Sequence, residues 1–202
     1  DELVVSRALD FDACLPADLA DNVYAYSRAA FDYLVESNTY DKLAPLVPRS
    51  GPECLELQTG DCDEVSNAWM SLLRVKEIPT WYEFGILWNM QADVWEGHAW
   101  ANVMLPLSDT WCADKGITMD SCFIEGEVDV VNARWLFHTP TVVSDWIEEH
   151  DPSGNSIDSA YSGWSFTTYP GGRAMYSSHI ETIDGPNIIG GTYKVAEKSE
   201  SF

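Results

Sequence analysis

The chain has 202 residues, of which 46% are hydrophobic, with nine Trp and nine Tyr among them, so it can bury a real core and is not a disordered chain. Its 33 acidic and 11 basic residues give a formal net charge of −22, which argues against nucleic acid and anionic membrane surfaces as partners. No apolar run reaches the roughly 18 residues of a membrane-spanning helix, so no membrane span is predicted.

Helices are predicted in the first part of the chain. Residues 16–38 repeat Leu, Val, Tyr and Ala at three- and four-residue steps, a spacing that predicts an amphipathic helix. Residues 39–53 contain three prolines and a glycine and predict a loop. A second helix is predicted from Cys62, with acidic residues in its first turn, basic residues in its last turn, and Pro79 at its end.

Strands are predicted after these helices. The segments 80–90 and 97–105 are rich in aromatic, small apolar and β-branched residues, and 127–137 is a third candidate strand. One or two helical turns are predicted within 143–150. Helices followed by strands predict an α+β fold with an antiparallel sheet.

The predicted domain organisation is a core over residues 1–150, which includes the N-terminal helix, and a second part over 151–202. This second part has several short β-like runs and is predicted to be a β-rich extension packed on the core.

The chain has five cysteines and no Cys-x-x-Cys pair, so a structural zinc site is not predicted. In an oxidising compartment at most two disulfides form. Cys112 and Cys122 flank a short polar loop that a disulfide would close. Cys14 and Cys54 flank the first helical segment, whose ends a second disulfide would tie together. Cys62 would then remain as the free thiol. Two alternatives stay open: five reduced thiols in a cytosolic protein, or a disulfide between Cys54 and Cys62. The odd cysteine and the acidity favour an extracellular or cell-surface location in an oxidising, saline environment.

Cys62 stands at the N-terminus of the second predicted helix, just after a turn that contains a glycine. A thiol becomes a nucleophile when a helix N-terminus stabilises its thiolate or a histidine accepts its proton. The neighbouring Asp61, Asp63 and Glu64 raise the pKa of a thiol, so the helix alone is not expected to activate Cys62. A histidine partner is needed, and His98 opens a predicted strand, although a lone strand histidine is more often structural.

Four short motifs follow one another in the order Gly60-Asp61-Cys62, Leu72-Leu73-Arg74, Ile78-Pro79 and Gly97-His98-Ala99-Trp100. This ordered set resembles the transglutaminase-like superfamily of cysteine enzymes. In that family a Gly-x-Cys motif opens a helix, Arg-x-x-Gly-Ile-Pro ends it, and a strand carries His-x-Trp. The resemblance covers roughly residues 60–114, and Glu77 stands where the family has glycine.

The resemblance implies a papain-like core in which the cysteine-bearing helix packs on an antiparallel sheet. It also implies that Cys62 attacks a carboxamide or peptide carbonyl and that His98, as general acid/base, protonates the leaving amine. The resulting thioester passes to an amine or to water. The backbone N–H of Cys62 and the side chain of Gln58 are candidate donors to the oxyanion, and a solvated loop amide is the alternative for Gln58.

The family also places an aspartate at the end of the strand antiparallel to the histidine strand, usually after a tryptophan, where it orients the imidazole. Asp114, after Trp111, is the first candidate, with a solvated loop acid as the alternative. If residues 106–133 are an insertion, His138, after Trp135, holds this place and the acid is lost. The remaining candidates are Asp109, Asp120 and Asp129.

The predicted function is thiol-dependent acyl transfer on protein or peptide substrates, either as a crosslinking transamidase or as a cysteine peptidase or amidase. The alternative is an inactive extracellular or cell-surface domain that keeps the fold for binding or structure. No cofactor is expected. Asp151–Asp158 spaces oxygen ligands as calcium loops do, but Ser156 and Ser162 stand where an EF-hand has glycine and glutamate, so an ordinary polar loop is favoured over calcium.

Overall fold

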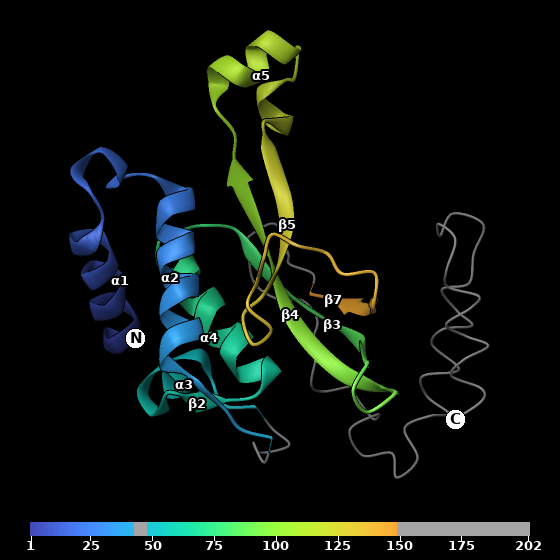
Figure 1. Ribbon diagram of the computed structural model, residues 1–202. Helices are drawn as coiled ribbons and strands as arrows, with labels where there is room; N and C mark the ends of the chain where they lie inside the picture. Colours follow the sequence, from blue (N-terminus) through green and yellow to red (C-terminus); the bar gives the residue numbers. More distant parts are fainter. Residues whose placement is uncertain (43–47, 149–202) are drawn as a thin grey trace. The chain divides into compact units, whose positions relative to one another are not determined.

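A computed structural model describes residues 1–42 and 48–148 (Figure 1). The chain divides into two compact units, one of Asp1–Glu83 with Ala99–His138 and one of Phe84–His98 with the chain from Thr139 onward. Within the described residues no helix has the length and apolar character to cross a membrane. The predicted extension over 151–202 and the calcium-like spacing at Asp151–Asp158 lie outside the described residues.

Helices make up most of the N-terminal part of the first unit. They are α1 (Glu2–Cys14), the short 3₁₀ helix η1 (Ala17–Leu19), α2 (Val23–Ser37), α3 (Gly51–Leu57) and α4 (Cys62–Arg74). The single helix predicted over 16–38 is broken, because the Asn22 side chain caps a new helix by accepting the Ala25 N–H at 2.9 Å. The second predicted helix is confirmed as α4.

Three helices were missed by the sequence prediction, namely α1, α3 and the short α5 (Asp109–Lys115). Helix α1 begins after Asp1, whose carboxylate accepts the N–H groups of Leu3 and Val4. Helix α3 lies in part of the segment predicted as a loop. Its first turn contains Pro52, where a missing N–H costs nothing, and Ser50 and Glu53 form a reciprocal capping box.

The strands form two sheets. Strands β1 (Thr39–Tyr40) and β2 (Thr59–Gly60) pair in parallel, and the larger sheet has the order β6-β5-β4-β3-β7. The bounds of the larger sheet's strands are β3 Thr80–Asn89, β4 Val94–Pro106, β5 Phe123–Asp129, β6 Arg134–Trp135 and β7 Val142–Ile147. Strand β5 is antiparallel to both β4 and β6. The predicted fold class, helices with an antiparallel sheet, is confirmed.

One predicted strand and one predicted helical segment are wrong. The strand predicted over 127–137 is split into β5 and β6 by a turn in which Ala133 has a φ of 51°. The helical turns predicted within 143–150 are replaced by β7. Gly85 explains how β7 reaches the sheet, because a Cβ on Gly85 would lie 1.9 Å from the carbonyl oxygen of Val143.

The core of the first unit forms around α4. Trp69, Leu72 and Leu73 of this helix are fully buried. Helix α2 is tied to α4 by two hydrogen bonds, from Tyr26 Oη to the Leu72 carbonyl at 2.7 Å and from Trp69 Nε1 to the Ser27 carbonyl at 3.4 Å. On β4, the alternate residues from Ala99 to Leu105 are also buried. Figure 1 shows α1 and α2 side by side, with α4 next to α2.

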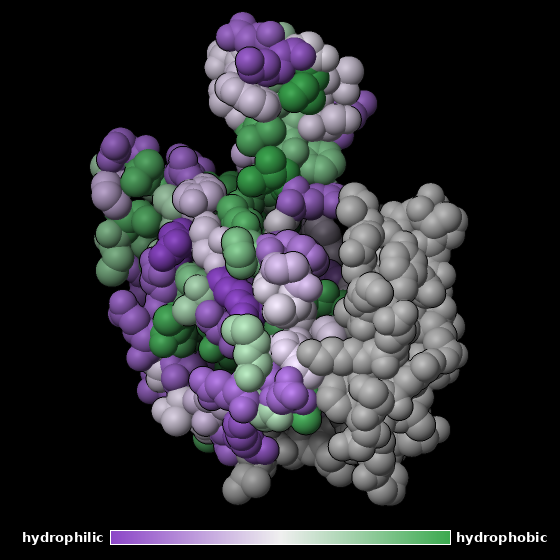
Figure 2. Space-filling view, turned by 45° about the vertical axis from the view of Figure 1, so that its right-hand side comes forward, coloured by the Kyte–Doolittle hydropathy of each residue, from purple (hydrophilic) through white to green (hydrophobic). Residues whose placement is uncertain are grey.

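A disulfide closes the excursion between β4 and β5, which contains α5 (Asp109–Lys115) and the 3₁₀ helix η2 (Met119–Ser121). Cys112 and Cys122 are bonded as predicted, with a Cα–Cα distance of 5.8 Å. A disulfide is compatible with the predicted oxidising exterior. Figure 2 shows hydrophobic and hydrophilic side chains next to one another on this projecting end, where Trp111 and Met119 are exposed.

The other predicted disulfides are not formed. Cys14, Cys54 and Cys62 are free. The Cys14–Cys54 pairing is wrong because Cys14 ends α1 at the surface, whereas Cys54 lies fully buried on α3. The alternative pairing of Cys54 with Cys62 is also absent, so the thiol of Cys62 is retained.

Candidate active site

Cys62 is the first residue of α4, and the turn before it requires glycine. A Cβ on Gly60 would lie 2.8 Å from Glu64 Cβ and 3.2 Å from Cys54 Sγ, which is too close for any larger residue. Asp61 is the N-cap, and its carboxylate accepts the Asp63 N–H at 3.2 Å. The Gly-Asp-Cys sequence therefore places the thiol at the N-terminus of the helix for local steric and capping reasons.

The Cys62 thiol is buried between α4 and β4. Only 8% of Cys62 is exposed. Its Sγ accepts a hydrogen bond from the backbone N–H of Ala99 and donates one to Asp63 Oδ1 at 3.3 Å. Ala99 is the residue that directly follows His98 in β4. The start of the helix thus meets the strand at the residue next to the predicted histidine.

The surroundings of Cys62 favour the protonated thiol. Burial raises its pKa well above the ordinary value, and the charges of Asp63 and Asp61 raise it further. The N–H of Ala99 acts in the opposite direction but does not offset these effects. As the sequence indicated, the helix N-terminus alone does not produce a thiolate at neutral pH.

Glu64 holds the turn that carries Cys62. It is fully buried, and its carboxylate accepts the backbone N–H of Arg49 at 3.0 Å, an Arg49 guanidinium nitrogen at 3.2 Å and the Asp61 N–H at 3.1 Å. The last contact completes a capping box with Asp61. The Asp-x-x-Glu spacing around Cys62 is the sequence signal for this contact, which the sequence analysis did not use.

Gln58, the predicted oxyanion donor, is exposed at the end of α3. Its backbone has a φ of 52°, and its Nε2 donates to Tyr33 Oη on α2 at 3.3 Å. The side-chain amide is therefore engaged with α2, which matches the alternative interpretation of a surface amide.

His98 lies on β4 and is 5% exposed. His138, the alternative third member, has a side chain that is 63% exposed, and its Nδ1 lies 2.7 Å from Glu127 Oε1 on β5. Burial is the main cause that raises the pKa of Glu127, whereas His138 lowers it.

Asp114 is exposed on α5, at the far end of the β4–β5 ladder. The ladder runs from the pair Ala101–Val128 to the pair Pro106–Phe123, and α5 follows Pro106. Ala99, which contacts the Cys62 thiol, lies beyond the opposite end. At about 3.3 Å per residue, β4 from Ala99 to Pro106 is roughly 23 Å long. The structure therefore does not bring Asp114 to the thiol, and Figure 1 shows α5 at the tip of the excursion.

Asp129 is a buried carboxylate at the Cys62 end of the same ladder. It is the last residue of β5, directly after Val128, and is 6% exposed. Asn132 Nδ2 donates to it at 2.8 Å and an Arg134 guanidinium nitrogen at 3.4 Å. Neighbouring residues of a strand face opposite sides of the sheet, so Asp129 faces away from Val128 and from its partner Ala101. Asn102 also faces away from Ala101, so Asp129 and Asn102 lie on the same side of the sheet.

Glu83 on β3 is a further buried carboxylate on this side of the sheet. It is 5% exposed and accepts a hydrogen bond from Asn102 Nδ2. The sequence analysis did not single out Glu83 or Glu127, although both are acidic residues inside otherwise apolar strands. Their proximity follows from strand pairing, which a single sequence does not specify.

Three possible metal-ligating atoms, from Asp61, Cys62 and Asp63, lie within 4.8 Å of one another. Two of these side chains already have roles, because Asp61 caps α4 and Asp63 accepts the hydrogen bond from the thiol. We assign no metal to them.

We expect Asp63→Asn to accelerate alkylation of Cys62 by iodoacetamide at pH 8. The pKa of the thiol lies above this pH, so a lower pKa increases the thiolate fraction, about tenfold for each pKa unit. Alkylation would be followed site by site by peptide mass spectrometry. Asp18→Asn, which changes an exposed acid on η1, is the matched control and should leave the rate unchanged. Equal rates in Asp63→Asn and the parent protein would show that the carboxylate does not raise this pKa.

Comparisons with known proteins find one family whose matched segment includes Cys62. Residues 16–114 match the family model of the transglutaminase-like superfamily. A solved structure from Cytophaga hutchinsonii, described as a "Putative Cysteine Protease", aligns at 16% identity with a TM-score of 0.48, over 71% of this chain and 40% of its own length. No curated protein matches. Residues 16–114, the part of the chain that contains Cys62 and His98, are thus similar to the transglutaminase-like superfamily.

Proposed function

We propose that this chain catalyses thiol-dependent acyl transfer on protein or peptide carboxamides, with Cys62 as the nucleophile. The observation that carries the proposal is the position of the thiol. It stands at the first residue of α4, inside the segment that matches the family, and it accepts the N–H of the residue next to His98. This location supports a cysteine and histidine pair of the kind that the motif order implies.

In the proposed mechanism His98 removes the thiol proton as Sγ attacks the carbonyl carbon. A protonated resting thiol makes this general-base route necessary, because no preformed thiolate is available at neutral pH. The tetrahedral intermediate places its negative oxygen near backbone N–H groups at the start of α4, including that of Cys62. The C–N bond then breaks, His98 returns the proton to the leaving amine, and a thioester remains on Cys62. An amine or water then attacks the thioester and releases the free thiol.

We further propose Asp129 as the acid that orients His98. The family places this acid at the end of the strand antiparallel to the histidine strand, and Asp129 is the last residue of β5, the antiparallel neighbour of β4. Its burial and its place at the Ala99 end of the ladder favour it over Asp114. Asp129 was one of the remaining candidates in the sequence, and the strand register is what supports it.

A second candidate function is an inactive binding domain on the cell surface or in the extracellular space. The observation that favours it is the raised pKa of the buried Cys62 thiol, since an unreactive buried cysteine has the same property. The two candidates differ in whether Cys62 forms a covalent acyl adduct.

The test is to incubate the protein with p-nitrophenyl acetate and to map acetyl groups by mass spectrometry. We expect an acetyl group on Cys62 that is lost in Cys62→Ala and retained in Cys14→Ala, which removes an exposed free thiol on α1. Cys54 is an internal control, because burial raises the pKa of its thiol to about 11. No adduct on Cys62 would contradict the enzyme and support the binding domain. Dansylcadaverine incorporation into casein, compared with casein hydrolysis, would then show whether amine or water accepts the acyl group.

A further inference from the structure

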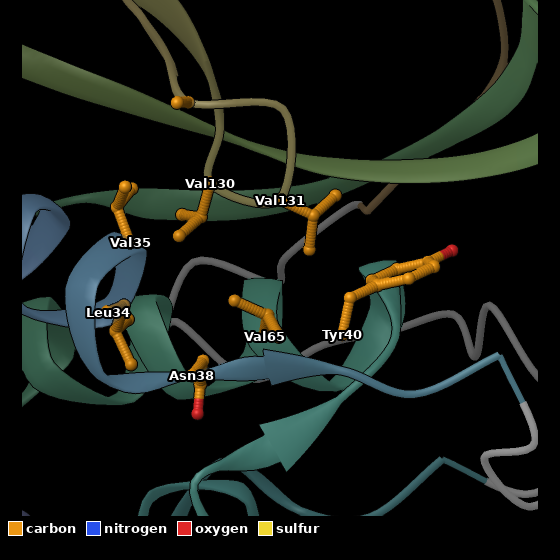
Figure 3. A pocket seen from close by; sticks show the side chains of 8 residues that line it. Leu34, Val35, Asn38, Tyr40, Val65, Val130 and Val131 are labelled. Atoms are coloured by element: carbon orange, nitrogen blue, oxygen red, sulfur yellow. The ribbon is translucent and has the colours of Figure 1, made fainter.

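A pocket of about 80 Å³ that is lined mainly by aliphatic residues lies in the first unit (Figure 3). Its deepest lining residues are Leu34 of α2, Val65 of α4 and Val130 of the turn after β5, all at most 3% exposed. Val35 and Tyr40 line it at the surface, with exposed fractions of 38% and 51%. The pocket therefore opens to solvent and has a floor of branched aliphatic side chains.

No charged group lines the pocket, and its one amide side chain does not face into it. Figure 3 shows the oxygen of Asn38 pointing away from Val65, Val130 and Val131. A charged side chain placed in the pocket would lose its hydration without gaining a charged partner among the lining side chains. The chemistry of the lining thus selects an aliphatic occupant.

Three of the lining residues are close in the chain or in the sheets to Cys62. Val65 is one helical turn beyond Cys62 on α4. Tyr40 pairs with Gly60, just before the cysteine. Val130 directly follows β5 and Ala99 lies on β4, both just beyond the same end of the β4–β5 ladder, and the Ala99 N–H contacts the Cys62 Sγ. Cys62 itself does not line the pocket, but these links place the lining next to the turn that carries it.

We propose that this pocket binds a branched aliphatic side chain of the acyl-donor polypeptide, close to the carbonyl that Cys62 attacks. This inference rests on the proposed function and adds a substrate class to it. A cavity of about 150 Å³ accommodates a benzene ring. A pocket of about half that volume accommodates the side chain of valine or leucine and excludes an aromatic ring.

The charges around the pocket favour a foreign, basic polypeptide over a second copy of this chain. Asp41 follows Tyr40, and Asp61 and Asp63 flank Cys62. Two copies with a net charge of −22 each would repel one another at this surface. Lys or Arg residues on either side of the aliphatic residue would instead be attracted.

The test compares alkylation of Cys62 by iodoacetamide, N-isobutyl iodoacetamide and N-(1-naphthylmethyl) iodoacetamide. We expect the isobutyl reagent to react at least about tenfold faster than iodoacetamide, because each buried carbon contributes roughly a fourfold gain and two of the four carbons already suffice. The naphthyl reagent should show no such gain, because its ring exceeds the pocket. The second-order rate constants would be measured by peptide mass spectrometry.

Val131→Trp should fill the pocket and bring the ratio of the isobutyl rate to the iodoacetamide rate down to about one. Val131 is half-buried, so a larger side chain there does not disturb the core. Val5→Trp, at a 44% exposed position on α1, is the matched control and should keep the preference. A preference that survives in Val131→Trp would overturn the assignment of the pocket.

A measurement that does not need a reactive thiol separates this proposal from the proposed function. N-Isobutyl acetamide, which cannot alkylate, should shift the methyl NMR signals of Val65 and Val130 in the parent protein but not in Val131→Trp. If Cys62 is inert and these signals still shift, the proposed function is contradicted, but binding of an aliphatic group in the pocket is confirmed. If Cys62 reacts but the isobutyl group gives neither acceleration nor shifts, the pocket proposal is overturned. If dilution alone shifts these signals, a second copy of the chain occupies the pocket, and the pocket proposal is also overturned.

Discussion

Acyl transfer is expected to fall to the uncatalysed background in Cys62→Ala and by roughly 10²- to 10⁴-fold in His98→Ala, the usual contribution of a general acid/base. In the proposed mechanism His98 has no role without the thiol, so the double variant should be no worse than Cys62→Ala. The measurement is kcat and KM for casein hydrolysis or amine incorporation. Activity in His98→Ala within about twofold of the parent protein would contradict the pairing of these two residues.

The same assay locates the orienting acid. Asp129→Asn should lower kcat by as much as about 10⁴-fold with little change in KM, because the amide stabilises neither the required tautomer nor the imidazolium. Asp114→Asn, on the exposed α5, is the matched control and should leave kcat unchanged. The opposite pattern would restore Asp114 as the third member.

Arg49→Ala is expected to lower the free energy of unfolding by about 3–5 kcal/mol, the usual cost of leaving a buried carboxylate without its partner. Arg49 donates to Glu64, whose side chain is 0% exposed, while 22% of the Arg49 side chain is exposed. The loss would be measured by urea denaturation. Arg28→Ala is the matched control, because its pair with Asp32 is exposed and contributes roughly 0.5 kcal/mol or less.

Adding Glu64→Gln to Arg49→Ala should recover part of this stability, because the double variant buries no unpaired charge. The glutamine also keeps a side-chain oxygen that can accept the Asp61 N–H at the start of α4. A loss in Arg49→Ala no larger than that in Arg28→Ala would show that the buried pair does not hold this turn.

The helix and the two strands that carry the candidate site could be predicted from the sequence because their patterns are local. Helix α4 has acidic residues at its start, an apolar stripe and a proline after its end, and β3 and β4 are long runs of strand-forming residues. Helix α3 was missed because prolines indicated a loop, although one of them stands in the first turn, where it favours a helix. Strand β7 was misassigned because its backbone pairing depends on a close approach at Gly85, far away in the sequence.

The sequence by itself determined that Cys62 stands at a helix N-terminus, because the glycine turn, the Asp61 cap and the helix all form from neighbouring residues. Only the tertiary structure decided the state of the thiol. Its pKa is raised mainly by burial, and burial is produced by elements distant in the chain, among them the strand that supplies the Ala99 N–H. The proposal of Asp129 in place of Asp114 likewise rests on the register of β4 against β5, two strands that the excursion closed by Cys112 and Cys122 separates in the sequence. Desolvation and strand register both depend on long-range packing, which no local sequence pattern encodes.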